Sequence, residues 1–434
     1  MRTVQGAALD GLRARVRALG AEAPDRRTPP AAPTFGARLR GFVSTGTPRA
    51  SAAALRALKA RRGDGPALVR TRSGRTFLVV LDPLDLHRFY AEPVSLLAAD
   101  PPEKCRGLGP EEPAGIGCSR GELRAQRRRI NEEALAAGVP VHPSCGAFLA
   151  AVAEEAPHLT ATRVLDLVRA RHAVHRAARR IVLGDAAASD EELGGWLRQL
   201  RGGRARAART VYGRTLARIQ EYAAHADDGT LVGRATRRSD PAGALDPLRQ
   251  AHHWLLAMDA VPGTLLRTLL LLGAHPAEQD TAAAEATRGG TDGELPRLRA
   301  CVRESLRLFP VVPDLIRVTR AETEWRGVRY PAGTSVLLPA AFLQRDPERV
   351  PAAHVFVPGR WKNPDADRDI RIAPFSHGGG RCPGDQLGLM ITAAFCAEVL
   401  RGHRLAGARP VLDPVGPLPA TLDPGTIRLT LTRR

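Results

Sequence analysis

The sequence predicts a mainly α-helical protein with small β-sheets. Apolar residues recur at helical spacing through the middle of the chain, over segments 121–137, 143–155, 160–184 and 210–225. A longer apolar stretch over 245–274 predicts one buried central helix, because charged residues and a proline interrupt it too often for a membrane span. Segments with the composition of β-strands lie toward both ends of the chain, at 67–82, 311–342 and 409–434.

The N-terminal strand segment, "ALVRTRSGRTFLVVLD" (67–82), has a Ser-Gly turn between two short apolar runs, which predicts a β-hairpin. "DPLDLHRFYAEP" (82–93) predicts a short helix. Residues 97–120 are rich in Pro and Gly and are expected to form a loop before the helical middle of the chain.

The C-terminal part begins with "ELPRLRACVRESLRLFP" (294–310), a helix that we expect to stop at its final proline. "VRYPAGTSVLLPA" (328–340) predicts a turn between two β segments. The last helix starts just after Cys382, and residues 409–434 are predicted to form a terminal hairpin. The expected order therefore places helices in the middle and small sheets at both ends.

Composition limits the function without deciding it. Basic residues outnumber acidic ones 64 to 45, and the excess is almost entirely arginine, which indicates either a GC-rich coding sequence or a basic surface. Aromatic residues make up only 4%, whereas a nucleic-acid binder would interleave aromatics with its basic clusters. Residues 1–50, rich in Pro, Ala and Arg, are predicted to be a partly flexible lead-in, with 51–434 forming a single domain.

The six cysteines show no CxxC pair and no zinc-type spacing, and they do not form a disulfide framework in a chain of 434 residues. We therefore expect a reducing, cytoplasmic compartment. The N-terminus has no apolar run long enough for a signal peptide or membrane anchor, so a soluble protein without a membrane partner is expected.

One cysteine lies in an unusual loop, "FSHGGGRCPGDQLG" (375–388), directly before an apolar helical segment. At a helix N-terminus, Cys382 would feel the positive end of the helix dipole, which favours the thiolate. The glycines beside it would let a large flat group approach the backbone. Three interpretations stay open at this point: a nucleophile with His377 as its base, a ligand to iron, or a buried cysteine in a turn.

Two further motifs lie upstream of this loop. "ESLR" places Glu304 and Arg307 on one face of a helix, and "FVPGRW" supplies Arg360. These motifs and the Phe-x-x-Gly…Cys-x-Gly loop occur in the order found in cytochromes P450, and the chain resembles that superfamily from about residue 65 to its end. The resemblance implies the P450 fold, with a long central helix over the haem and the cysteine loop before a C-terminal helix.

The resemblance also implies a cofactor, heme b (iron protoporphyrin IX), with Cys382 as the axial ligand of its iron. Arg381 and the motif residues Phe375, Gly378 and Gly384 are then expected at the cofactor. Three arginines, Arg124, Arg128 and Arg317, match positions that pair with the haem propionates. Glu304, Arg307 and Arg360 match a buried structural charge triad.

Two positions depart from the family pattern. The family has Arg or His two residues before the cysteine, donating to a propionate, whereas this chain has Gly380 there and Arg381 one residue later. On the central helix, Asp259 falls on the acid position of the pair that delivers protons to iron-bound oxygen, but Ala260 stands where the alcohol is expected. Thr264, one turn further, is the alternative alcohol, and "DAVPGT" predicts a kink.

The function implied is that of a soluble, monomeric, bacterial-type monooxygenase, which inserts one atom of O2 into a lipophilic secondary metabolite. Electrons would come from a separate ferredoxin and an NAD(P)H-dependent ferredoxin reductase. One alternative is a haem enzyme that uses peroxide or couples radicals, because the alcohol is missing. Another is a non-catalytic P450-like partner protein, which the presence of Cys382 disfavours. Nucleic acid is not an expected partner.

Overall fold

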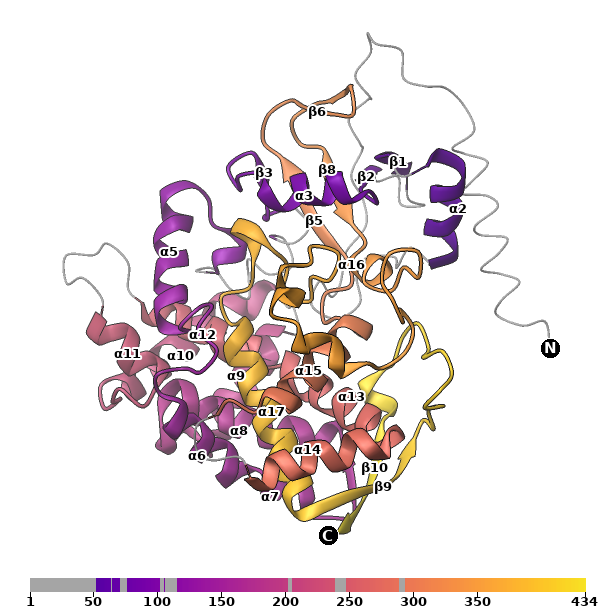
Figure 1. The fold of residues 1–434 in the computed structure, drawn as a ribbon. Coiled ribbons are helices and arrows are strands. Elements are labelled where there is room, and N and C mark those ends of the chain that lie inside the picture. The colour runs from indigo at the N-terminus through magenta and orange to yellow at the C-terminus, as the bar shows by residue number, and fades with distance from the viewer. Residues whose placement is uncertain are drawn as a thin grey trace.

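The computed structural model describes residues 52–63, 65–70, 76–101, 105, 115–201, 205–238, 247–288 and 293–434. The lead-in predicted for residues 1–50 lies outside these ranges. Within them the protein is mainly α-helical with small sheets, as the sequence predicts (Figure 1). The helices are α2 (Ala52–Arg62), α3 (Pro83–Ala91), α5 (Gly121–Ala134), α6 (Cys145–Glu155), α7 (Pro157–Thr160), α8 (Leu167–Leu183), α9 (Glu191–Arg201), α10 (Ala205–Ala223), α11 (Leu231–Arg238), α12 (Leu248–Ala257), α13 (Ala260–Ala274), α14 (Pro276–Arg288), α15 (Pro296–Leu308), α16 (Ala340–Leu343) and α17 (Asp385–Gly402).

The strands form three sheets. A five-stranded sheet has the order β1-β2-β8-β5-β3, a three-stranded sheet the order β4-β10-β9, and β6 pairs with β7. In the largest sheet only the β2–β8 pair is parallel. The strands are β1 (Ala67–Arg70), β2 (Thr76–Val79), β3 (Leu97–Ala98), β4 (Val164–Asp166), β5 (Leu315–Thr319), β6 (Thr323–Trp325), β7 (Val328–Tyr330), β8 (Ser335–Leu338), β9 (His403–Arg409) and β10 (Arg428–Arg433).

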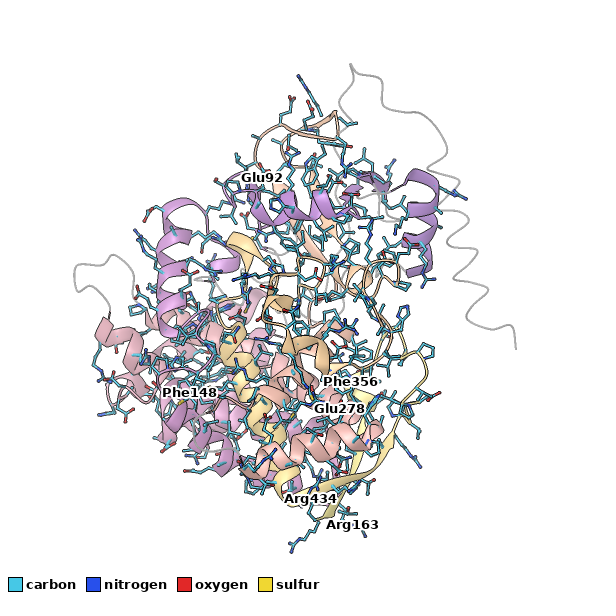
Figure 2. The ribbon with its side chains drawn as sticks, viewed as in Figure 1. Glu92, Phe148, Arg163, Glu278, Phe356 and Arg434 are labelled. Atoms are coloured by element: carbon cyan, nitrogen blue, oxygen red, sulfur yellow. The ribbon has the colours of Figure 1, made fainter. Side chains whose placement is uncertain are left out.

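The sheet and the helices occupy two regions. The five-stranded sheet lies with α2 and α3 at the top of Figure 1, and the helical region lies below it. Each region has its own apolar core, and the helical core is the larger. Phe148 and Phe356 belong to the helical core, and Figure 2 labels both in the helical region. The cysteine loop, 375–388, connects toward α17, which crosses the helical core.

Local signals explain where two predicted helices begin. Asp82 caps α3 by accepting a hydrogen bond from the Leu84 backbone N–H at 2.8 Å, and Pro83 takes the first helical position, where no N–H is needed. The helix predicted over 160–184 starts only at Leu167. Asp166 caps it, and the residues just before it pair with β10 as strand β4.

The long central helix predicted over 245–274 is interrupted. Its two parts, α12 and α13, are joined by a tight turn at Met258 and Asp259. Pro262 has no N–H to donate to the Met258 carbonyl, which instead accepts from the Val261 N–H at 3.0 Å. The helical hydrogen-bond pattern is therefore interrupted on the N-terminal side of the proline, as expected for a proline inside a helix.

By length and composition, 248–274 resembles a membrane span, and it is the one such helix among the described residues. However, 72% of its most apolar window is buried inside the protein, as in the core helix of a soluble fold. The two β segments beside the 328–340 turn also differ from a simple hairpin, because β7 pairs with β6 and β8 pairs with β2 and β5. The terminal hairpin of β9 and β10 begins before residue 409.

Candidate cofactor site

The Cys382 loop is a tight turn closed by its own backbone. The Cys382 N–H donates to the Phe375 carbonyl, and the Arg381 N–H donates to the Gly378 carbonyl, both at 2.9 Å. Ser376 and Gly378 adopt left-handed conformations, with φ of +63° and +61°. The turn leads into α17 at Asp385, so Cys382 precedes the N-terminus of the longest helix of the C-terminal part.

The Cys382 thiol is accessible to solvent, yet burial by the surrounding protein raises its pKa. The Gly384 N–H and the charges of Arg128 and Arg381 oppose this rise without overcoming it. The helix dipole alone therefore does not produce a free thiolate, and a metal cation, which deprotonates a coordinating thiol, suits the position better than a nucleophile role.

His377, the candidate base, does not support the nucleophile either. Its Nε2 lies 3.4 Å from the Ile372 carbonyl, and its ring packs edge-on against Tyr90 with centroids 5.1 Å apart. Burial lowers the pKa of His377. Over the described part of the chain, no hydrogen bond joins His377 to Cys382.

Three arginines approach three successive residues of the loop. Arg124 on α5 donates from Nη2 to the Gly379 carbonyl at 3.0 Å, and Arg128 on the same helix donates from Nη1 to the Arg381 carbonyl at 2.6 Å. Arg317 on β5 lies against Gly380. The structure thus brings together the three arginines that the sequence analysis selected, from two distant parts of the chain.

The arginine expected to lie beside the cysteine points elsewhere. The Arg381 guanidinium donates from Nε and Nη2 to one oxygen of Asp385, at 2.8 and 2.6 Å. Asp385 is buried at the first position of α17, where a carboxylate is favoured by the helix dipole. Arg381 therefore fixes the start of α17.

The glycine run has a reason that the sequence did not reveal. A Cβ on Gly378 would lie 1.9 Å from the Tyr90 carbonyl oxygen, and one on Gly380 would lie 1.9 Å from Nη2 of Arg317. On Gly379 it would lie 3.3 Å from a methyl group of Val94. The space beside the glycines, which was expected to admit a flat cofactor, is thus filled by Tyr90 of α3, Val94 just after it and Arg317 of β5.

The charged residues of the two upstream motifs form one buried cluster. Glu304 and Arg307 are both fully buried and share two hydrogen bonds at 2.8 and 3.0 Å. Arg360 donates from Nε to Glu304 at 3.0 Å, and the Trp361 indole donates to the same carboxylate at 3.0 Å. The sequence placed Trp361 in the motif without assigning this contact to it.

Asp259 has a partner that the sequence analysis missed. Its Oδ1 lies 2.5 Å from Nε2 of His175 on α8, and both side chains are about a quarter exposed. Thr264 is buried, and its hydroxyl donates to the Ala260 carbonyl at 2.8 Å. The helix break brings the carboxylate to α8, whereas the Thr264 hydroxyl is bonded within its own helix.

The residues present fit a haem. Such a group needs one iron ligand and cations for two propionates, and the loop offers Cys382 beside three arginines. Within the described ranges, neither Arg124 nor Arg317 forms an ion pair with a carboxylate. Burial lowers the pKa of both guanidinium groups, and a neighbouring cation lowers each further: Arg128 acts on Arg124, and Arg124 acts on Arg317. Desolvated cations of this kind suit an anionic ligand.

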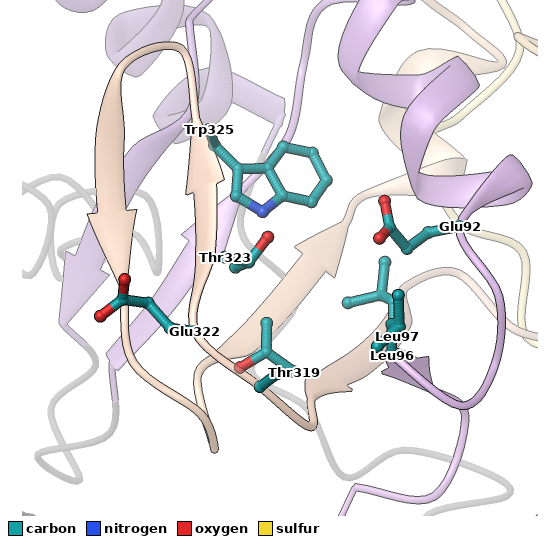
Figure 3. A pocket seen from close by; sticks show the side chains of 8 residues that line it. Glu92, Leu96, Leu97, Thr319, Glu322, Thr323 and Trp325 are labelled. Atoms are coloured by element: carbon teal, nitrogen blue, oxygen red, sulfur yellow. The ribbon is translucent and has the colours of Figure 1, made fainter.

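Two hollows elsewhere do not compete with this site. A cavity of about 40 Å³ lies at the edge of the large sheet, lined by Glu92, Leu97, Thr319 and Trp325 among others (Figure 3). It is close to the size of a single water molecule's share of the liquid, so it is too small for an organic substrate. A broader hollow of about 560 Å³ is lined by Arg360 and by several residues between Asn363 and Ile372, where acidic and basic groups alternate.

Comparison with known proteins identifies related chains. The family model of cytochrome P450 matches residues 258–415. A cyclooctat-9-en-7-ol 5-monooxygenase from Streptomyces melanosporofaciens is 35% identical over 226 residues, which are 46% of this chain and 49% of that protein. A sterol 14alpha-demethylase from Mycobacterium bovis is 32% identical over 120 residues, 27% of each chain.

A solved structure extends the likeness to the fold. The retinoic-acid-bound cyanobacterial CYP120A1 superposes with a TM-score of 0.69 at 17% identity, covering 87% of this chain and 94% of that one. By contrast, the sequence matches span about half, or less, of the length of the curated relatives.

Proposed function

Because the chain belongs to the cytochrome P450 superfamily, we propose that residues 51–434 form one haem-thiolate monooxygenase domain. Its cofactor is heme b, held by Cys382 on the iron and by Arg124, Arg128 and Arg317 at the propionates. The observation that carries this proposal is the convergence of these arginines on residues 379–381, beside an accessible cysteine at the start of α17.

When bound, haem would supply a redox-active iron for the activation of O2, while the protein's own residues supply protons and exclude solvent. Asp259 holds a proton-transfer position at the break between α12 and α13. His175 Nε2, hydrogen-bonded to Asp259 Oδ1 and partly exposed, passes protons from solvent to that carboxylate. The Glu304 cluster keeps α15 fixed against the segment that precedes the cysteine loop.

The substrate class we favour is a lipophilic secondary metabolite. The cyclooctat-9-en-7-ol 5-monooxygenase, which matches 46% of this chain, acts by its name on a cyclic alkenol, and this supports a lipophilic substrate. Electrons come from an acidic ferredoxin and its NAD(P)H-dependent reductase, for which the arginine-rich chain provides charge complementarity. The enzyme is taken to be a cytoplasmic monomer.

The experiment that tests the cofactor assignment is a carbon monoxide difference spectrum of the reduced protein. We expect the red-shifted Soret band of a thiolate-ligated haem, and its loss in Cys382→Ala. Cys145→Ala, which removes another partly accessible free cysteine, should leave the band in place. A protein that binds no haem, or a Cys382→Ala variant with the same band, overturns the proposal.

One observation favours a second candidate, oxidation driven by peroxide. The alcohol position holds Ala260, and the nearest hydroxyl, on Thr264, is bonded to the Ala260 carbonyl. Hydrogen peroxide already carries the protons and electrons that O2 would have to receive. Oxidation driven by peroxide therefore depends less on proton delivery by the Thr264 hydroxyl. Turnover with hydrogen peroxide, at a rate matching that with ferredoxin and reductase, would favour this candidate.

A further inference from the structure

The helix that holds the cysteine loop has little apolar surface of its own. α5 lies at the margin of the helical region (Figure 1), and half of its 14 residues are charged. Among the described residues of this helix, only Asn131 and Ala134 are buried, while Ile130 packs partly buried against the helical core. Because the Ala134 side chain is a single methyl group, α5 needs a directional contact elsewhere to fix its rotation.

The Asn131 side chain provides such a contact by joining α5 to α12. Its Oδ1 accepts from the Trp254 indole Nε1 at 2.8 Å, and its Nδ2 donates to Gln250 Oε1 at 3.0 Å. Nδ2 also donates to the Arg127 carbonyl of its own helix at 2.7 Å. Asn131 is fully buried, and only 2% of Trp254 and of Gln250 is exposed. Water cannot replace these hydrogen bonds if they break, so the network favours one arrangement of the two helices.

Asn131 lies on the same face of α5 as the two arginines that bind the cysteine loop. It follows Arg128 by three residues and Arg124 by seven, and residues at these spacings stack along one helix face. A rotation of α5 about its axis would therefore move Asn131 and both guanidinium groups together. Such a rotation would draw Arg124 and Arg128 away from the Gly379 and Arg381 carbonyls, which they now reach at 3.0 and 2.6 Å.

We propose that Asn131 is a positioning residue of the cofactor site. By binding α12, it sets the rotation of α5 at which Arg124 and Arg128 hold the cysteine loop. Since α12 ends at Ala257, next to the break that carries Asp259, one buried amide ties the cysteine loop to the helix that leads to the proton-transfer position. The inference rests on the proposed haem site for its functional meaning, whereas the anchoring of α5 is measurable in haem-free protein.

The first test measures amide hydrogen exchange in the haem-free protein. Asn131→Leu keeps the bulk of the side chain and removes its hydrogen bonds. Exchange should become about tenfold faster in peptides from α5 and from the cysteine loop, because the loop loses the two arginine contacts when α5 shifts. Peptides from α14 and β9 should exchange as they do in the parent.

The matched control is Gln279→Leu. Gln279 is another buried amide, 1% exposed on α14, and its Oε1 accepts from the Leu405 N–H of β9 at 2.8 Å. This variant should speed exchange in α14 and β9 and leave α5 and the cysteine loop unchanged. If both variants speed exchange in the same places, Asn131 contributes only general stability and the inference fails.

The second test follows haem transfer to apomyoglobin. Asn131→Leu should release haem about 10- to 100-fold faster than the parent, as expected when a charged hydrogen bond to the cofactor is lost, whereas Gln279→Leu should release it like the parent. With Arg124 and Arg128 both replaced by glutamine, Asn131→Leu should have little further effect, because it acts through them. Trp254→Phe removes only the indole donor and should speed release in the same direction by a smaller factor.

Two results would overturn the inference: unchanged haem release in both Asn131→Leu and Trp254→Phe, or an Asn131→Leu effect of full size after both arginines have been replaced. Should Asn131→Leu fail to fold, Trp254→Phe decides by the same two measurements. A parent protein that binds no haem rejects the proposed function, while the hydrogen-exchange comparison still tests the anchoring by Asn131, so the two failures are distinguishable.

Discussion

Replacing Glu304 by glutamine should severely weaken the fold. The carboxylate is fully buried, and each of its oxygens accepts three hydrogen bonds. Oε1 accepts from Arg307, Arg360 and the Val357 backbone N–H. Oε2 accepts from Arg307, Arg360 and the Trp361 indole. Whichever oxygen becomes the amide nitrogen, three donors will face another donor.

The charge change adds to the lost hydrogen bonds. Arg307 is fully buried, and its other acceptors are the neutral carbonyls of Gln344, Ala353 and Val355. In the variant, its charge has no carboxylate partner. Breaking a buried ion pair from one side costs about 3–5 kcal/mol, which is a large share of a total stability of about 5–15 kcal/mol.

Urea unfolding of the haem-free protein, followed by far-UV circular dichroism, measures this loss without involving the cofactor. The matched control is Arg368→Ala, which breaks an ion pair to Asp365 at 2.9 Å whose side chains are 84% and 69% exposed. Its unfolding midpoint should not move, since such pairs are screened by water. A Glu304→Gln midpoint equal to that of the control would refute the argument that this cluster stabilises the core.

Two further predictions concern single carboxylates. Asp259→Asn should lower kcat by about tenfold or more, because it cuts the proton path through His175. It should also divert reducing equivalents from product to peroxide and raise the solvent isotope effect on turnover. Unchanged coupling of electron use to product would contradict this role of Asp259. Burial alone would raise the pKa of Glu155, but hydrogen bonds from Arg176 and Arg180 outweigh it and lower that pKa from 4.5. This stabilisation is present above pH 4.5 and lost as the pH falls through the lowered pKa, so Glu155→Gln should flatten the acid side of a stability–pH profile; parallel profiles would argue against it.

The order of helices and strands was largely predictable, because it follows from apolar spacing. The start of α8 was not, since Asp166 pairs with Arg428 in β10 and that contact joins distant parts of the chain. For the same reason, the sequence could not tell that β7 and β8 belong to different sheets. Helices α9, α11 and α14 were not identified from the sequence pattern.

The site shows a similar division. Motifs select Cys382 and the Glu304 cluster because spacing within a helix or turn carries that information. His175 carries no such signal, since its contact with Asp259 depends on the break between α12 and α13. Likewise, the sequence left open whether Arg381 replaces the missing cation at Gly380, and its pairing with Asp385 is a contact that the sequence pattern does not reveal.

The hydrogen bonds that hold the cysteine loop bear on which substitutions next to Cys382 the protein can accept. Arg124 and Arg128 bind the carbonyl oxygens of Gly379 and Arg381, which every amino acid possesses, so these two contacts do not depend on the side chains at those positions. Replacing the Arg381 side chain should therefore leave its carbonyl bound to Arg128, and the backbone that presents the Cys382 sulfur should stay in place.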